Sequence, residues 1–265
     1  MDPVLAFLAG MIQGVTEWLP VSSSGQVLVL LDNLGMDADD ALALAFFLHF
    51  GTLLAVVVRL RGDVREVLGN LPGWRTDPMV RFLLFATLVS LVVGFALVLT
   101  LEEAVEGSLG GVLLTVLVGA FLIVTGLVLR AAKGRMGERK VEDLTGGDAV
   151  VMGLVQGLAA LPGISRSGMT VSALLMDRVD ADEALRLSFL MSIPVTMAVV
   201  LYELVFWDLT SIGVTPIIIG VVAAFVLGYL TIEGLMALSR RIDWSVFCVA
   251  FGGIAVAAGV ALMFV

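Results

Sequence analysis

Long uncharged stretches dominate the chain and set the pattern of expected elements. Five stretches contain no Asp, Glu, Lys or Arg: 41–58, 82–101, 107–129, 209–232 and 244–265. A sixth stretch, 187–207, carries one acid, Glu203. A helix of roughly 20 apolar residues crosses the ~30 Å hydrocarbon layer of a bilayer. The pattern therefore predicts six transmembrane helices, over about 41–60, 81–101, 108–130, 185–207, 211–238 and 244–265.

Two further apolar stretches are interrupted by proline, glycine and serine. Residues 3–31 are broken by Leu19–Gly25, and residues 149–176 are broken by Pro162–Gly168. Each arm has about 12 residues, or ~18 Å of helix, which is shorter than the hydrocarbon layer. Proline and glycine free backbone groups that lipid cannot satisfy, so such breaks must be buried in protein or line a cavity. Both stretches are predicted to be re-entrant helical hairpins.

The two interrupted stretches are related in sequence. An offset of 143 residues aligns Gln13–Gly25 with Gln156–Gly168 without a gap. The same offset aligns Asp37–Leu44 with Asp180–Leu187. A single offset that holds across two blocks indicates a duplication, because shared apolar composition would not preserve the register.

The predicted fold is an all-α polytopic membrane protein with a single membrane domain, 1–265. Its first repeat, 1–135, contains hairpin 3–31 and three spans, and its second repeat, 149–265, contains hairpin 149–176 and three spans. Because three is odd, the second copy must be inverted relative to the first. In inverted repeats, broken helices typically meet near the bilayer midplane and form the binding site.

The basic residues indicate the orientation of this multi-pass protein. Lys and Arg are concentrated in the loops at 59–81 and 130–148, and cytoplasmic loops retain basic residues. Both termini are then expected outside the cell membrane. Hairpin 3–31 would enter from outside and hairpin 149–176 from the cytoplasm.

Composition supports membrane embedding and excludes several kinds of site. The 265 residues are 60 % hydrophobic and 15 % charged, whereas soluble domains average about 25 % charged residues. The net charge of −9 gives no reason to expect a nucleic-acid partner. With His49 as the only histidine and Cys248 as the only cysteine, a Cys/His zinc cluster and an intramolecular disulfide are both excluded.

The hairpin tips carry polar residues that suit phosphate chemistry. They are Gln13, Glu17, Ser22, Ser23, Ser24 and Gln26 in the first, and Gln156, Ser165, Arg166, Ser167 and Thr170 in the second. Ionisable groups inside a membrane are costly and are usually partnered or functional. Arg166 stays charged, and its guanidinium fork matches phosphate oxygens, while hydroxyls and helix N-terminal amides can complete the cradle.

Several roles remain open for the individual tip residues. Glu17 could pair with Arg166, hold a divalent cation between pyrophosphate oxygens, or act as a base on water. A Glu17–Arg166 pair that only fastens the hairpins would leave the serines unexplained, although Ser22, Ser23 and Ser24 could individually cap helices. His49 is either a core histidine or a residue that faces the cavity.

These motifs resemble those of the undecaprenyl-diphosphate phosphatase family, also known through bacitracin resistance. The resemblance covers essentially the whole chain and is most specific at Gln13–Gly25, Leu161–Thr170 and Ser188–Pro194. It implies hydrolysis of undecaprenyl, or a similar polyprenyl, pyrophosphate to the monophosphate and inorganic phosphate, which recycles the lipid carrier for cell-envelope glycan synthesis. It also implies a divalent cation, Mg²⁺ or Ca²⁺.

The resemblance also assigns roles to particular residues. Gln13 and Glu17 match the positions associated with the metal and the pyrophosphate, Ser23 matches the proposed nucleophile, and Arg166 matches the phosphate clamp. Bacterial members usually have His where this chain has Gln26, and glutamine cannot take a proton from serine as imidazole can. Either Glu17 activates Ser23 or water, or His49 substitutes.

Two further hypotheses accompany the phosphatase, a transporter and a structural membrane scaffold, of which the scaffold would leave the polar, charged hairpin tips unexplained. The inverted repeat would also suit a flippase for the polyprenyl phosphate, and lipid movement without phosphate release would favour that alternative. Besides the polyprenyl pyrophosphate lipid and the bilayer, a homodimer is a further candidate partner.

Overall fold

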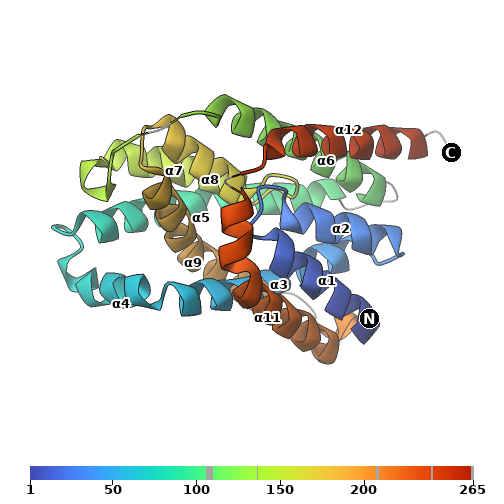
Figure 1. Cartoon of the computed structure of the whole chain (residues 1–265). Helices are drawn as coiled ribbons and strands as arrows, with labels where there is room; N and C mark the ends of the chain where they lie inside the picture. The colour runs from blue at the N-terminus through green and yellow to red at the C-terminus, as the bar shows by residue number, and fades with distance from the viewer. Residues whose placement is uncertain (106–109, 136, 207–208, 240, 264–265) are drawn as a thin grey trace.

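A computed structural model describes residues 1–105, 110–135, 137–206, 209–239 and 241–263, and these form a bundle of helices (Figure 1). Within these ranges, six helices are long and apolar enough to cross a membrane. They are α3 (Ala38–Arg59), α5 (Pro78–Val105), α6 (Gly110–Ala132), α9 (Ala181–Phe206), α11 (Val214–Ser239) and α12 (Trp244–Leu262). The prediction of an all-helical protein with six candidate spans is therefore confirmed.

Helix caps explain where the observed boundaries differ from the predicted ones. α9 begins at Ala181, four residues before the expected 185, because the Asp180 carboxylate accepts hydrogen bonds from the first amides of the helix. Asp37 caps α3 in the same manner. Parts of the predicted spans, namely 108–109, 207 and 264–265, lie outside the described residues.

Each interrupted stretch forms two short helices. The first stretch forms α1 (Pro3–Thr16) and α2 (Ser23–Asn33), and the second forms α7 (Gly146–Leu158) and α8 (Arg166–Met176). α7 begins three residues before the expected 149, because Thr145 and Asp148 form a capping box. None of the four exceeds 14 residues, which corresponds to roughly 21 Å of helix.

Several helices pack against spans from the other half of the chain. α1 lies against α11, α7 lies against α5, and α6 lies against α12. The α1–α11 crossing is close: a Cβ on Gly10 would lie 2.2 Å from the Gly220 carbonyl oxygen. Glycine at these crossings lets the helix backbones approach, as is common for helices packed in membranes.

Four short elements lie outside the six candidate spans and the two interrupted stretches. They are α4 (Arg61–Asn70), η1 (Leu71–Gly73), η2 (Val141–Asp143) and α10 (Leu209–Ile212). α4 falls in the stretch that was expected to be a loop, 59–81, and has no buried residue. Figure 1 shows the N- and C-terminal ends on one side of the bundle and α4 on the opposite side.

The two interruptions meet in the interior of the bundle. Trp18 packs edge-to-face on Phe189 of α9, with 5.6 Å between ring centroids, and its Nε1 donates to the Gly228 carbonyl of α11 at 3.1 Å. Leu19 and Val21 pack with Leu122 and Cys248. The apolar residues of the first interruption therefore anchor it, which leaves the polar residues beside them available for a site.

Candidate active site

Serine caps shape the starts of the two helices that leave the interruptions. Ser22 caps α2 from a left-handed backbone conformation (φ 58°), and its Oγ accepts from the Gly25 amide at 3.4 Å. Ser165 caps α8, and its Oγ accepts from the Gly168 amide at 3.2 Å. The serine-capped N-termini of α2 and α8 border the same small cavity, and helix N-termini favour anions.

Ser22 and Thr125 hold the second interruption against the first and against α6. The Gly163 amide donates to Ser22 Oγ at 3.0 Å. Thr125 Oγ1 donates to the Gly163 carbonyl at 3.3 Å and accepts from the Ser165 amide at 3.1 Å. Gly163 has φ 99°, and a Cβ there would lie 2.3 Å from the Val118 carbonyl oxygen. The site therefore needs glycine at this turn for both conformation and space.

Glu17 is the centre of a hydrogen-bonded cluster that joins the two interruptions. Its Oε1 accepts from Arg166 Nη2 at 2.6 Å. Its Oε2 accepts from Ser23 Oγ at 2.6 Å and from Gln13 Nε2 at 3.0 Å. The carboxylate is 8 % exposed and the arginine 16 %. A buried acid and a buried base in direct contact compensate each other's charge.

His49 of α3 also faces this cluster. Its Nε2 lies 3.5 Å from Glu17 Oε2. Its Nδ1 lies 2.7 Å from the Ala45 carbonyl oxygen, and since a carbonyl can only accept, Nδ1 carries the proton of that hydrogen bond. Nε2 is therefore the nitrogen that can exchange a proton with the site. Of the two interpretations of His49, the structure supports the one in which it faces the cavity.

Arg166 is held by groups that sequence reasoning did not assign. Its Nη1 donates to the Ser188 carbonyl at 3.4 Å, and its guanidinium carbon lies 5.6 Å from the centroid of the Phe189 ring. Both belong to the Ser188–Pro194 segment of the family resemblance, which was the available signal. A backbone carbonyl and an aromatic face fix the arginine without neutralising it.

A polar cavity of about 30 Å³ lies among these groups. Its polar lining comprises Glu17, Ser22, Ser23, Ser24, His49, Ser165, Arg166 and Ser167. A second cavity of about 90 Å³ shares Ala159, His49 and Arg166 with it and is otherwise lined mainly by apolar residues, including Phe46, Phe95 and Val199. A small polar space beside an apolar one suits a phosphate attached to a hydrocarbon chain.

Besides Gln13, which hydrogen-bonds Glu17 but does not line the polar cavity, three predicted substrate-binding residues lie outside that lining. Gln26 donates to the Val21 carbonyl at 3.3 Å, and Thr170 Oγ1 donates to the Arg166 carbonyl at 2.8 Å. Gln156 donates to Ser90 Oγ at 3.1 Å and lines the apolar cavity instead. Contact between these three residues and the substrate stays a prediction.

The donors that a metal would need are oxygens near Glu17. In the described ranges, no group of three or more His, Cys, Asp and Glu side chains could hold a metal ion. Gln13 Oε1, however, is buried without a hydrogen-bond donor among the described residues, and it belongs to the amide that contacts Glu17. One carboxylate with one free amide oxygen suits a hard cation that takes its other ligands from phosphate and water.

The chain is similar in sequence to known proteins. The family model described as bacitracin resistance protein BacA matches residues 6–257. An undecaprenyl-diphosphatase of Haloarcula marismortui is 40 % identical over 98 % of both chains. Proteins with the same name from Methanococcoides burtonii and Methanothrix thermoacetophila are 38 % and 37 % identical, over 95 % and 97 % of this chain and 96 % and 97 % of theirs.

Proposed function

The chain belongs to the bacitracin resistance protein BacA family, and from that premise we propose that its Glu17–Arg166 cluster is the active site of an undecaprenyl-diphosphatase. The protein is a multi-pass membrane hydrolase that converts undecaprenyl pyrophosphate to the monophosphate and inorganic phosphate. This reaction recycles the lipid carrier. The alternative of a flippase without hydrolysis is not favoured, since the similar proteins are named for the phosphatase activity.

One observation carries the assignment of the site: a single carboxylate, Glu17, contacts both the arginine and the hydroxyl that the reaction needs. Arg166 presents several N–H donors, so it can bind phosphate oxygens bidentately when the pyrophosphate replaces or shares its contact with Glu17. That exchange leaves Glu17 free to accept a proton. Substrate binding and activation of the nucleophile are thereby linked.

The proposed reaction begins at the Ser23 hydroxyl. Ser23 Oγ attacks the terminal phosphorus as its proton passes to Glu17 Oε2, which already accepts its hydrogen bond at 2.6 Å. The bond from that phosphorus to the bridging oxygen breaks, and its electron pair leaves with the polyprenyl monophosphate. Water then attacks the phosphoserine, inorganic phosphate is released and Ser23 regains its proton. His49 Nε2 accepts or returns the proton that Glu17 carries.

A divalent cation fits this site as a shared ligand of protein and substrate. Glu17 and Gln13 Oε1 would hold it, and when bound, Mg²⁺ or Ca²⁺ would offset the negative charge of the pyrophosphate oxygens. Gln13 has a further task without the metal, since its Nε2 orients the Glu17 carboxylate. Ser22, Ser24, Ser165 and Ser167 line the remaining wall and supply hydroxyls to the phosphates.

The two interrupted stretches are proposed to be re-entrant hairpins of an inverted repeat. The offset in sequence supports this, since α2 and α8 start and end at aligned residues. The packing of α1 on α11 and of α7 on α5 supports it as well, because an inverted twofold relation exchanges those pairs. The basic loops are proposed to be cytoplasmic and both termini outside. The homodimer stays a prediction, which cross-linking in native membranes can test.

Release of inorganic phosphate from polyprenyl pyrophosphate in detergent micelles tests the function. We expect wild-type protein to release phosphate with Mg²⁺ or Ca²⁺ and to lose activity with a chelator. Arg166→Ala and Glu17→Gln should each reduce the rate by about 10²-fold or more, as loss of a charge-stabilising group does. Arg65→Ala, which removes an exposed arginine of α4, is the matched control and should keep full activity. Full activity in Arg166→Ala would contradict the assignment.

Ser23→Ala separates covalent from direct hydrolysis. If Ser23 is the nucleophile, its loss should remove activity to the same extent as loss of Glu17, and acid quenching of wild type should trap phosphoserine. Substantial activity in Ser23→Ala would instead indicate that water attacks with Glu17 as its base. That outcome would revise the nucleophile and leave the phosphatase intact.

A further inference from the structure

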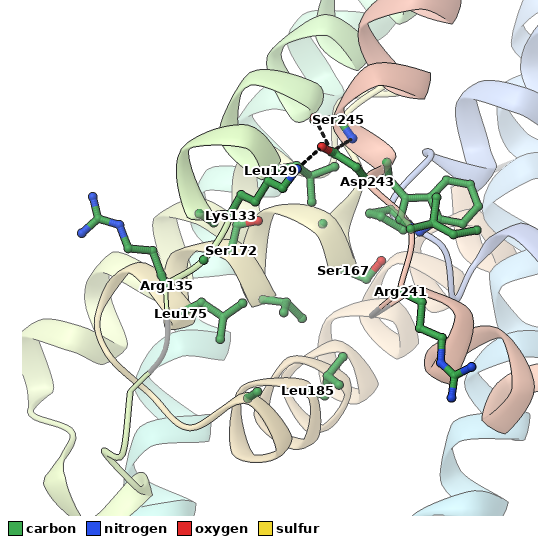
Figure 2. Close-up of a pocket in the computed structure, with 18 of the residues that line it drawn as sticks. Leu129, Lys133, Arg135, Ser167, Ser172, Leu175, Leu185, Arg241, Asp243 and Ser245 are labelled. Carbon is green, nitrogen blue, oxygen red and sulfur yellow. Dashed lines mark hydrogen bonds and ion pairs between the residues drawn. The ribbon is translucent and has the colours of Figure 1, made fainter.

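A larger pocket lies beside the interruptions (Figure 2). Its volume is about 380 Å³, which is within the range of small-molecule sites, roughly 300–1,000 Å³. Pro20 of the first interruption and Ser167 and Gly168 of α8 line it. Ser167 also lines the polar cavity, so this residue is shared by the two spaces.

The interior of this pocket is largely apolar. Trp18, Leu129, Val171, Leu175, Leu185, Phe189 and Trp244 line it, together with the hydroxyls of Ser167 and Ser172. These residues come from α6, α8, α9, α12 and the first interruption, so the pocket lies between helices. An interior of this kind favours a hydrocarbon chain over a water-soluble ion.

The mouth of the pocket is basic. Lys133, Arg135 and Arg241 line it. Lys133 Nζ pairs with Asp243 at 2.6 Å, which neutralises the one carboxylate in the lining. Arg135 and Arg241 have no ion-pair partner in the part of the chain that the structure describes. Figure 2 shows them on opposite sides of the pocket, with their guanidinium groups directed outward.

The pocket adjoins a second hollow, whose lining carries three arginines and three acidic residues. That hollow, of about 680 Å³, shares Leu185, Phe189 and Arg241 with the pocket and is also lined by Arg59 and Arg186. Those two arginines are paired, with Glu233 and Asp63 respectively. The unpaired positive charge is therefore concentrated at Arg135 and Arg241.

We propose that this pocket binds an anionic phospholipid of the basic, cytoplasmic side of the membrane. The apolar chain would occupy the interior, and the phosphate would lie at the mouth, where rotation of the exposed Arg135 and Arg241 side chains can bring their guanidinium groups to it. Basic pockets between transmembrane helices on the cytoplasmic side recognise anionic headgroups in this manner, and arginine is suited to phosphate oxygens. This site is separate from the one at Glu17, and the bound lipid would support both interruptions.

Lipid binding to detergent-purified full-length protein, measured by native mass spectrometry, tests the proposal. Phosphatidylglycerol should bind wild type more tightly than phosphatidylcholine, and Arg135→Gln/Arg241→Gln should weaken phosphatidylglycerol roughly tenfold. The matched control is Arg61→Gln/Arg65→Gln, which removes the same charge from exposed α4 on the same side. Equal binding by wild type and Arg135→Gln/Arg241→Gln, or an equal loss in the control, would overturn the proposal.

Three further measurements identify the ligand and distinguish its site from the one at Glu17. Inorganic phosphate and glycerol phosphate should fail to compete with phosphatidylglycerol, because they lack the chain that the interior accommodates; competition by either would show a free-phosphate site instead. The thermal unfolding midpoint of wild type should rise on addition of phosphatidylglycerol, since a ligand that binds the native state stabilises it. Phosphate release measured in neutral detergent should be unchanged in Arg135→Gln/Arg241→Gln.

Discussion

At the scale of single residues, proton transfer in the site is limited to a few ionisable groups. Glu17 and Arg166 contact each other directly, and His49 is the other ionisable side chain of the polar lining. The hydroxyls around them can donate or accept but do not change charge in the physiological range. Proton movement during the reaction must therefore pass among Glu17, His49 and the reacting oxygens.

His49→Gln is expected to lower kcat for phosphate release about 10²-fold, because a positioned acid–base group typically contributes 10²–10⁴-fold. Glutamine keeps hydrogen-bonding capacity at the position but cannot carry the proton. Circular dichroism and thermal unfolding should be near wild type, which would distinguish a catalytic loss from a folding defect.

Gln26→Ala tests the complementary expectation, since the resemblance implies that bacterial members of the family usually have histidine at the position of Gln26. Its amide donates to the Val21 carbonyl and lies outside the polar lining. We expect phosphate release within about twofold of wild type, because only a local, partly exposed hydrogen bond is lost. If Gln26→Ala were as inactive as His49→Gln, the division of roles between these two residues would be wrong.

At the scale of elements, the second interruption needs a backbone conformation that only glycine adopts without strain. Gly163→Ala should destabilise the protein by about 3 kcal/mol or more, because it combines a left-handed φ with a clash against the α6 backbone. Gly35→Ala is the matched control: Gly35 has φ 81° but nothing within 4 Å of its Cβ position, so roughly 1–2 kcal/mol is expected. Chemical denaturation in mild detergent compares the two.

The ends of α6 and α12 are joined by an ion pair whose acid sensitivity can be predicted. The hydrogen bond from Lys133 lowers the pKa of Asp243 from 3.8 to about 2, with Ser245 contributing further. A carboxyl whose pKa is lowered by folding stabilises the native state above its ordinary pKa, and that contribution is lost as the pH falls toward 2. The unfolding midpoint of wild type should therefore fall more between pH 4 and pH 2 than that of Asp243→Asn. Equal falls would contradict this assignment.

The positions of the spans could be predicted from the sequence, whereas several side-chain contacts and one helix could not. Span positions follow from apolar length alone, so α3, α5 and α11 were placed within a few residues. The contact between Glu17 and Arg166 was open to prediction because ionisable groups in a membrane need partners. The Ser188 carbonyl and the Phe189 ring were not, since any carbonyl or aromatic residue could serve until helix rotation is known. α4 was missed because it is short and charged and contains two glycines, although Val64 and Val67 pack against the core.

At the scale of the whole molecule, the end of the bundle that carries the basic loops differs in charge from the end that carries the two termini. The basic loops and α4 lie opposite the two termini (Figure 1). If the basic end is cytoplasmic, the hairpins enter from opposite leaflets and their tips meet inside the membrane. This arrangement brings the phosphate to a polar cavity and the lipid chain to an apolar one at the same place in the membrane.

Labelling of introduced cysteines in intact cells tests that orientation. Gly35→Cys lies in the connection between α2 and α3, and Arg65→Cys lies on exposed α4. A membrane-impermeant maleimide should label Gly35→Cys in intact cells and Arg65→Cys only after permeabilisation, because the positive-inside rule retains α4 in the cytoplasm. Cys248 is buried, so wild type should label weakly under both conditions and serves as the control. Labelling of Arg65→Cys in intact cells would reverse the orientation, and the lipid pocket would then face the outer leaflet.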